Sequence, residues 1–483
     1  MHPSSLPGSH GIGDLGAASR DFVDWLARAG ASVWQVLPLV PVGAGDSPYS
    51  SAAALAGNPW LIDLQALVLD GLLEAVPPPP RFPVDRIDVA AMTAYKLPLI
   101  ASAAARLVAG HPLYSALQAF IAAQGWVKDV ALYFALKQAS GNKPWWEWPA
   151  ALRDRDPAAL SEARAEHAAA YHRVLCEQFL FERQWQALRG YARQRGVSLY
   201  GDVPIYVDWD SADVWVHRAQ FQLDAEGAPL EVAGVPPDYF SATGQLWGNP
   251  LYEWAAMAKD HHAWWVARLQ RVLSQVDIVR IDHFRAFAAY WAVPRGSLDA
   301  RPGKWRQGPG EALFDDLKKA LGELPIVAED LGVIDDAVRA LVRGVGLPGM
   351  KVLQFAFGED AKNPFLPHNY APDCVAYTGT HDNDTTRGWW QSSDEQTRDH
   401  VRRYLGVDGH DVVWDLMRAA LASVANTVIV PLQDILELGA AARMNVPAAP
   451  TGNWLWRVHA DAFLDDRSHR FRTLVSLYGR TAP

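Results

Sequence analysis

The sequence predicts an α/β protein built as a closed barrel of eight parallel strands, with helical and loop insertions on the C-terminal face. Short apolar runs recur along the chain, and helical patterns separate most of them, as expected for a parallel sheet. Several runs end in acidic residues, which is typical of the rim where barrel enzymes carry their active sites. The eight runs are residues 33–38, 58–64, 198–207, 276–281, 325–329, 350–357, 374–378 and 426–432.

Two long segments interrupt this strand–helix rhythm. We expect one catalytic domain over residues 1–483, with a mainly helical insertion at residues 65–170 that follows from its alanine-rich helical pattern. A second insertion at residues 208–275 is too long for an ordinary connection and holds an aromatic loop at 235–250. Loops of this length and composition are usually functional, so we expect this loop at the active site.

Composition narrows the class of protein. The 483 residues carry 44 basic and 54 acidic side chains, a net charge of −10 with no basic tract, which disfavours nucleic acid and anionic membranes as partners. The two cysteines are isolated, which suits a reducing cytoplasm and no structural metal. We see no signal peptide and no apolar run of membrane-spanning length, and we expect no cofactor.

The most informative stretch is residues 276–285, where a β-branched run ends in alternating charges. Arg280 and Asp282 are two residues apart, so on a strand their side chains lie on the same side. A neighbouring cation keeps a carboxylate ionised and its pKa low, as a nucleophile requires. A purely structural arginine–aspartate pair at the end of a strand explains this stretch alone equally well.

Further acids follow other predicted strands, at the same rim of the barrel. They are Asp202 in the third strand, Glu329 and Asp330 after the fifth, Asp382 and Asp384 after the seventh, and Asp434 after the eighth. Each could instead cap the helix that follows it, an alternative that is strongest for Asp330 and Asp384. Repetition of acids at one rim is hard to explain by packing alone.

Two carboxyl groups that flank one bond are the equipment of glycoside chemistry. We predict that Asp282, beside Arg280 and Arg285, stays ionised. The negative charges of Asp282 and Asp382 are expected to raise the pKa of Glu329, so that it holds a proton near neutral pH. Neighbouring strands allow the retaining separation of about 5–5.5 Å between the carboxyl groups. Asp382 is then placed to oppose the positive charge of an oxocarbenium-like transition state.

The chain resembles the amylomaltases, the 4-α-glucanotransferases of glycoside hydrolase family 77, in motifs that keep their order along nearly its whole length. These motifs are residues 6–16, Trp-Gln-Val-Leu-Pro at 34–38, Ser-Pro-Tyr-Ser-Ser at 47–51, residues 201–207, the 235–250 loop, Arg-Ile-Asp-His-Phe-Arg at 280–285, Ala-Glu-Asp-Leu-Gly at 328–332, residues 379–385 and Thr-Gly-Asn-Trp at 451–454.

The resemblance implies specific roles for matching residues. Asp282 corresponds to the nucleophile, Glu329 to the general acid/base and Asp382 to the transition-state stabiliser, while Arg280 orients Asp282. The implied contacts with the glucan come from His381 at the cleavage point, from Tyr49, Asp202, Trp247 and Asn249 along the subsites, and from Tyr239 and Phe240 in a loop above the chain.

The same resemblance implies a reaction and a substrate class. Members transfer a segment of an α-1,4-glucan, such as a maltooligosaccharide or a chain of starch or glycogen, to the 4-hydroxyl of another glucan without metal or cofactor. Two other readings of the sequence remain. An α-amylase-type hydrolase would use the same acids with water as acceptor, and an inactive glucan-binding protein would retain the fold without turnover.

Overall fold

Seven parallel strands form the centre of the molecule in the computed structural model, which describes residues 1–237, 241–447, 449, 451–463 and 465–481. They lie in two sheets, with strand order β1-β2-β5-β8 in one and β11-β10-β9 in the other. The strands are β1 (Val33–Gln35), β2 (Ser198–Pro204), β5 (Ile278–Asp282), β8 (Ile326–Ala328), β9 (Gly349–Val352), β10 (Cys374–Tyr377) and β11 (Thr427–Ile429).

One apolar core joins the two parallel sheets. Its buried members are Tyr200, Val327, Met350, Val352, Val375 and Tyr377, and partly buried Val33, Ile278, Leu331 and Ile429 pack against them. Every one of the seven strands therefore contributes to the same interior, as the strands of a barrel do. The Ala328 N–H also donates to the Pro348 carbonyl at 2.9 Å, between β8 and β9. Within the described residues, however, the strand ladders do not close into a continuous ring.

The predicted strand at residues 58–64 is wrong, although the α/β class is confirmed. This segment is instead a 3-10 turn, Pro59–Leu61, followed by helix α2 (Leu64–Leu69), which Asp63 caps. Two glutamines of helix α8 replace the missing ladder. Gln178 pairs with the N–H and carbonyl of Gly57 at 2.6 and 3.0 Å, and Gln184 pairs with those of Asp63 at 2.7 and 3.1 Å. The buried backbone N–H and carbonyl groups of this segment are therefore hydrogen-bonded without a neighbouring strand.

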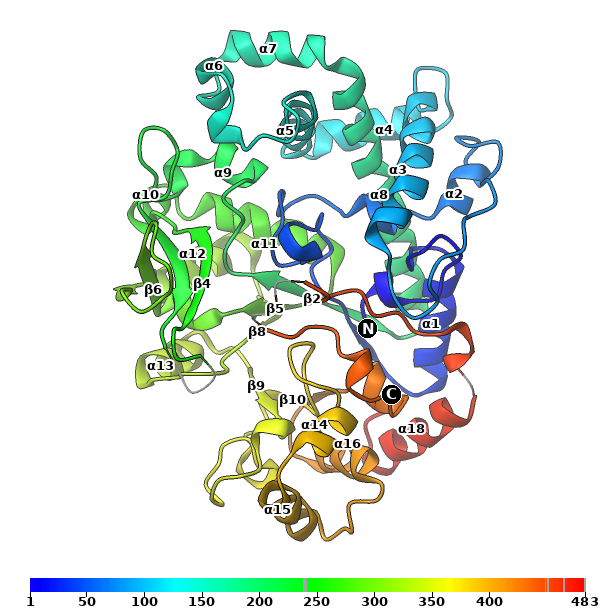
Figure 1. Ribbon diagram of the computed structural model, residues 1–483, viewed down its shortest axis with the longest axis vertical. Coiled ribbons are helices and arrows are strands. Elements are labelled where there is room, and N and C mark those ends of the chain that lie inside the picture. The colour runs from blue at the N-terminus through cyan, green and yellow to red at the C-terminus, as the bar shows by residue number, and fades with distance from the viewer. Residues whose placement is uncertain (238–240, 448, 450, 464, 482–483) are drawn as a thin grey trace.

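The helices surround and extend this centre, and those of residues 64–194 form the upper part of Figure 1. Helix α8, with 27 residues, is the longest and packs against α3 and α5. The helices are α1 (Ala17–Arg28), α2 (Leu64–Leu69), α3 (Val89–Arg106), α4 (Tyr114–Ala123), α5 (Val127–Ala139), α6 (Ala150–Arg153), α7 (Pro157–Glu166), α8 (Ala168–Gln194), α9 (Ala212–Val216), α10 (Trp254–Lys259), α11 (Ala263–Gln275), α12 (Glu311–Leu321), α13 (Asp336–Val345), α14 (Thr386–Ser392), α15 (Glu395–Leu405), α16 (Val412–Ala422), α17 (Leu432–Ile435) and α18 (Asp465–Leu477).

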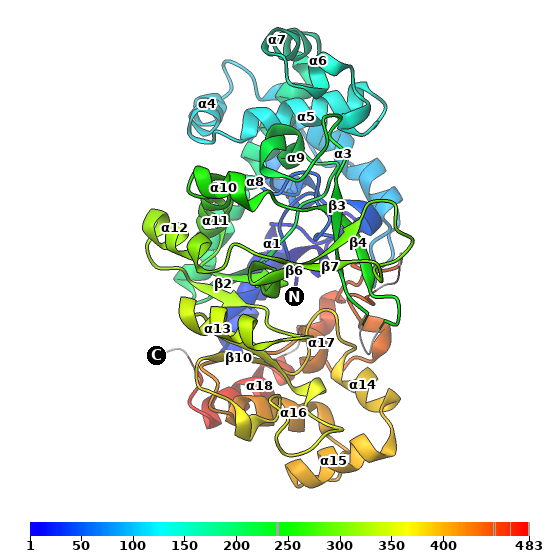
Figure 2. The same ribbon diagram turned by 90° about the vertical axis from the view of Figure 1, so that its left-hand side faces the viewer.

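A separate antiparallel sheet lies beside the parallel strands, with order β4-β3-β6-β7, and its strands are seen together in Figure 2. The strands are β3 (Glu231–Val235), β4 (Gln245–Pro250), β6 (Ala289–Pro294) and β7 (Lys304–Gln307). The predicted aromatic loop is therefore a β3–β4 hairpin that begins and ends in strands. Its strand β4 carries Trp247 and Asn249 towards the end of β2.

One finding concerns membranes. In the described part of the chain, no single helix is long and apolar enough to cross a bilayer, and one pair, α4 with α5, passes the test only as two helices bent by 102°.

Candidate active site

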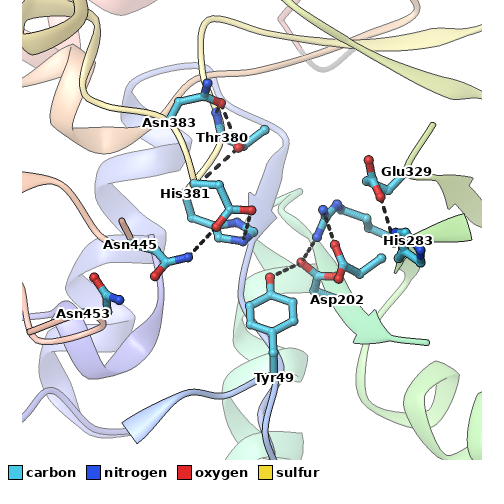
Figure 3. A network of polar contacts seen from close by, with 12 residues as sticks. Tyr49, Asp202, His283, Glu329, Thr380, His381, Asn383, Asn445 and Asn453 are labelled. Atoms are coloured by element: carbon cyan, nitrogen blue, oxygen red, sulfur yellow. Dashed lines mark hydrogen bonds and ion pairs between the residues drawn. The ribbon is translucent and has the colours of Figure 1, made fainter. Parts of the chain in front are cut away.

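Two acidic side chains lie at the C-terminal ends of neighbouring strands; one of them, Glu329, is seen beside His283 in Figure 3. Asp282 is the last residue of β5, and Glu329 directly follows β8. The two strands pair in register, with Ile281 opposite Ala328, and the Glu329 N–H continues the ladder by donating to the Ile281 carbonyl at 3.0 Å. The structure thus brings together the two acids that the sequence nominated as nucleophile and acid.

Arg280 joins Asp282 to a second aspartate, Asp202, which Tyr49 also contacts. Its guanidinium is buried and donates to Asp282 at 2.6 Å and to Asp202 at 2.5 Å. The hydroxyl of Tyr49 donates to the same Asp202 oxygen at 2.7 Å. Because Asp202 lies opposite Arg280 in the β2–β5 register, both side chains are on one side of the sheet. Arg280 is held in place from behind and offers its other edge to Asp282.

The subsite role expected for Asp202 needs revision. Its side chain has no exposed surface, and its neighbours are Tyr49 and Arg280. A carboxylate that is fully covered by protein does not touch a sugar in this arrangement. Its negative charge instead stabilises the buried guanidinium of Arg280, which would otherwise be costly to bury beside a single partner. The pKa of Arg280 is accordingly raised well above its usual value by Asp202 and Asp282, against the effect of burial.

The expectation of a low pKa for Asp282 is wrong in direction. Burial raises the pKa of Asp282 to about 6, although the charge of Arg280 opposes that rise. Arg285 takes no part, because its guanidinium contacts Asp335 and the Val333 carbonyl and lies over the ring of Trp305. Of the two arginines, it is Arg280 that contacts Asp282, and its charge keeps that carboxyl group largely ionised at neutral pH.

Glu329 is the more weakly acidic of the pair. Burial raises its pKa to about 8, and the negative charge of Asp282 adds to the rise. Two backbone N–H groups, of His283 at 2.7 Å and of Leu331 at 2.8 Å, donate to its two oxygens and hold the carboxyl group in place. At neutral pH Asp282 is therefore mostly an anion and Glu329 mostly carries a proton, the difference in protonation that the sequence analysis predicted.

His283 connects this pair to the aromatic hairpin. It has a left-handed backbone with φ of 52°, an uncommon conformation for a residue with a side chain, and this conformation accompanies the N–H contact with Glu329. Its half-buried ring, whose pKa is lowered to about 3 by desolvation and by Arg285, meets the edge of Trp247 at 4.7 Å between centroids. Trp247 is 38% exposed, so part of its indole is free for a ligand beside Glu329.

The predictions for the other residues between 235 and 250 have different outcomes. Asn249 donates to the Val207 carbonyl at 2.9 Å and so ties β4 to the segment after β2. Tyr239 and Phe240 lie outside the described residues, so their expected position over the glucan stays a prediction.

Asp382 lies on a loop, five residues after the end of β10. One of its oxygens accepts a hydrogen bond from Asn445 at 2.6 Å, and the other is 3.3 Å from Nε2 of His381. His381 in turn stacks on Tyr49, with 5.3 Å between ring centroids, and Trp454 lies 5.5 Å from Tyr49. His381 thus contacts both Asp382 and Tyr49, and His381 and Tyr49 are seen close together in Figure 3.

Sequence reasoning missed Arg443 and Asn445. Arg443 donates to the backbone carbonyl of Asp382 at 2.6 Å, and Asn445 donates to its carboxylate. Both come from a segment more than sixty residues further along the chain. They lie just before the motif at 451–454, which was the only sequence signal that this region belongs to the site.

Two other acids at the rim, Asp330 and Asp434, serve the fold, and a third, Asp384, is not the helix cap that it could have been. Asp330 accepts a hydrogen bond from the Met350 N–H, and Asp434 accepts from Thr378 and Thr386. Asp384 does not cap helix α14, because Thr385 does so. Among the residues that the structure describes, no three His, Cys, Asp or Glu side chains gather in a way suited to a metal ion.

The fold and this geometry define a class of protein. A barrel-like α/β enzyme with two half-buried carboxyl groups of unlike pKa at adjacent strand ends is equipped to break and remake glycosidic bonds.

Comparison with known proteins gives the family. The sequence profile of glycoside hydrolase family 77, described as 4-alpha-glucanotransferase, matches residues 1–463, and the chain belongs to this family and is an enzyme of this type.

Similar proteins include plant and bacterial enzymes. A chloroplastic/amyloplastic 4-alpha-glucanotransferase of Arabidopsis thaliana is 47% identical, covering 99% of this chain and 85% of its own length. A 4-alpha-glucanotransferase of Thermus thermophilus is 46% identical over 98% of this chain and 97% of its own. Among solved structures, an amylomaltase of Streptococcus agalactiae in complex with acarbose has a TM-score of 0.96 at 35% identity, covering 100% of this chain and 99% of that one.

Proposed function

We propose that the protein transfers segments of α-1,4-glucans by two successive displacements at the anomeric carbon. The unlike protonation of Asp282 and Glu329 at adjacent strand ends carries this proposal. In the first step an oxygen of Asp282 bonds to the anomeric carbon while Glu329 gives its proton to the glycosidic oxygen, and the released part of the donor leaves as an alcohol.

The second step reverses these roles. Glu329, now a carboxylate, takes the proton from the 4-hydroxyl of an acceptor glucan as that oxygen attacks the anomeric carbon and the bond to Asp282 breaks. Each step inverts the anomeric centre, so the α-configuration is retained overall. Asp382 opposes the positive charge that develops on the sugar ring in both steps, and His381 beside it contacts the sugar hydroxyls.

We further propose maltooligosaccharides and chains of starch or glycogen as donors and acceptors. The complex of the Streptococcus agalactiae amylomaltase with acarbose supports a glucan-shaped cleft in this fold. The part-exposed indole of Trp247 meets His283, whose N–H donates to the acid, and suits the apolar face of a sugar ring. Tyr239 and Phe240, eight and seven residues earlier in the sequence, are proposed to contact the glucan as well. A cytoplasmic location accords with two free, buried cysteines.

Maltotriose as sole substrate tests the proposal. Transfer yields a ladder of longer and shorter oligosaccharides together with glucose, because a sugar is the acceptor. Glucose and maltose without any longer product would instead identify a hydrolase, and the absence of turnover would identify a binding protein.

A further inference from the structure

The loop that carries Asp382 is hydrogen-bonded to a distant part of the chain, residues 443–445, and Figure 3 shows Asn445 of that segment beside His381 of the loop. Asn445 donates from Nδ2 to Oδ1 of Asp382 at 2.6 Å, and Arg443 donates from Nη2 to the Asp382 backbone carbonyl at 2.6 Å. The Asn445 N–H also donates to the His381 carbonyl at 3.1 Å. Two consecutive residues of the loop are thus held by three hydrogen bonds from one short segment.

This short segment is itself braced. Arg443 donates from Nε to the Asn445 carbonyl at 2.7 Å, so one guanidinium contacts both Asp382 and the residue that binds its carboxylate. The Trp454 N–H donates to the Met444 carbonyl at 2.8 Å, and Trp454 adopts a left-handed backbone with φ of 65°, a strained conformation for so bulky a residue. Its ring then reaches both Tyr49 and His381.

Asp382 needs such support more than the other two acids do. Its side chain is 43% exposed, and it lies on a loop where no strand ladder fixes its backbone. Charge stabilisation at a transition state depends on groups that are already in place, because reorientation during the reaction costs free energy. A half-exposed carboxylate that was free to rotate would meet this condition poorly.

We propose that Asn445 is a positioning residue for Asp382: it holds one carboxylate oxygen, while His381 lies 3.3 Å from the other, and so fixes the orientation in which the carboxylate meets the reacting sugar. The proposal rests on the role given to Asp382 above. An amide suits this task because it donates a hydrogen bond without a charge of its own, which leaves the negative charge of Asp382 available to the substrate. The cation beside it, Arg443, contacts only the backbone oxygen of Asp382 and not its carboxylate.

Two substitutions test the proposal on maltotriose, with kcat measured across about pH 5 to pH 9. Asn445→Ala removes the donor, and we expect kcat to fall about tenfold, since hydrogen bonds to charged groups are among the stronger ones in proteins. Asn445→Asp keeps the shape but places a second carboxyl group against Asp382. While protonated, the new carboxyl group can still donate to Asp382; once ionised, it repels it.

The signature is therefore a dependence on pH. The ratio of kcat for Asn445→Asp to that of the parent should be highest on the acidic side and fall as pH rises, whereas the ratio for Asn445→Ala should stay nearly constant. The groups that face this position are His381, Arg443, Asp282 and Tyr49. All of them are present in parent and variant alike, so the ratio isolates the new carboxyl group.

Control variants make the result decisive. Asn369→Asp makes the same chemical change at an exposed asparagine whose amide donates only to the Ala361 and Asn363 carbonyls, and its ratio to the parent should not change with pH. Melting temperatures show that each variant is folded. If kcat of both Asn445 variants stays within about twofold of the parent at every pH while Asp382→Asn loses activity, the proposed role of Asn445 is wrong and that of Asp382 stands. Unchanged turnover by Asp382→Asn would overturn the role of Asp382 itself.

Discussion

The three acids of the site are positioned in two different ways. Asp282 and Glu329 extend from paired strands, so the ladder between β5 and β8 sets their separation. Asp382 extends from a loop, and hydrogen bonds from Arg443 and Asn445 set its place. Under the roles proposed above, the covalent and proton-transfer steps would depend on backbone pairing, whereas charge stabilisation would depend on side-chain contacts between distant segments.

The largest effect is expected at the acid on the strand end. Glu329→Gln keeps the shape and one hydrogen-bond acceptor but has no proton to give, so kcat should fall by about 10²–10⁴-fold with a starch or maltooligosaccharide donor. Assays with natural donors measure this loss. A variant with parental turnover would show that Glu329 is not the acid.

The next largest effect is expected when the cation that contacts Asp282 is removed. Arg280→Met leaves Asp202 buried without its charge partner, which should destabilise the fold by about 3–5 kcal/mol. The pKa of Asp282 should rise further, because Arg280 is the main influence that lowers it, and the acidic limb of activity should move to higher pH. Chemical denaturation and a pH profile measure both effects.

Arg285→Met is the matched control for this change. Arg285 belongs to the same stretch of sequence and is also buried, but it contacts Asp335, Val333 and Trp305 instead of Asp282. Its substitution should lower stability and leave the acidic limb where it was. A shift of equal size in both variants would contradict the specific role of Arg280.

The pH dependence of the parent enzyme follows from the two carboxyl groups. Asp282 acts as an anion, so kcat/KM should rise with pH through its pKa of about 6, and Glu329 acts as an acid, so kcat/KM should fall through its pKa of about 8. Below the lower pKa and above the upper one, kcat/KM should change by about tenfold per pH unit. Activity that stays constant from neutral pH to about pH 10 would contradict the assignment of Glu329.

The smallest effect on activity is expected for a residue far from the active site. Gln178→Ala removes the two hydrogen bonds that satisfy the buried backbone of Gly57, and the unpaired groups should cost about 2–4 kcal/mol of folding free energy. Activity of the folded enzyme should change little. Chemical denaturation and kcat on the same preparation separate the two effects, and a stability equal to that of the parent would show that the glutamine is dispensable.

The sequence could predict the residues that paired strands position, but not those that depend on contacts between distant segments. Arg280, Asp282 and Glu329 were found because strand periodicity and strand ends are local patterns, which place their side chains without knowledge of the rest of the fold. The α/β class follows from the same patterns. The direction of the pKa shift of Asp282 could not be predicted, because burial depends on what the remainder of the chain packs over it.

Contacts between distant segments account for the other errors. Residues 58–64 read as a strand because the apolar run is local, while the two glutamines that replace its ladder lie 121 residues further on. Asp202 has the character of a ligand-binding acid in sequence, but the side chains of Tyr49 and Arg280 cover it. Asn445 has no signal of its own, since its meaning comes only from Asp382, 63 residues earlier.

Trapping the sugar on the enzyme is the most direct test of the proposed roles of Asp282 and Glu329. Glu329→Gln incubated with a maltosyl fluoride should still release fluoride, which needs no proton from Glu329, but the following transfer should be slow because the base is missing. Digestion and mass spectrometry of the quenched protein should then locate the sugar on the peptide that contains Asp282. Fluoride release without an adduct, or an adduct on Asp382, would contradict the central claim.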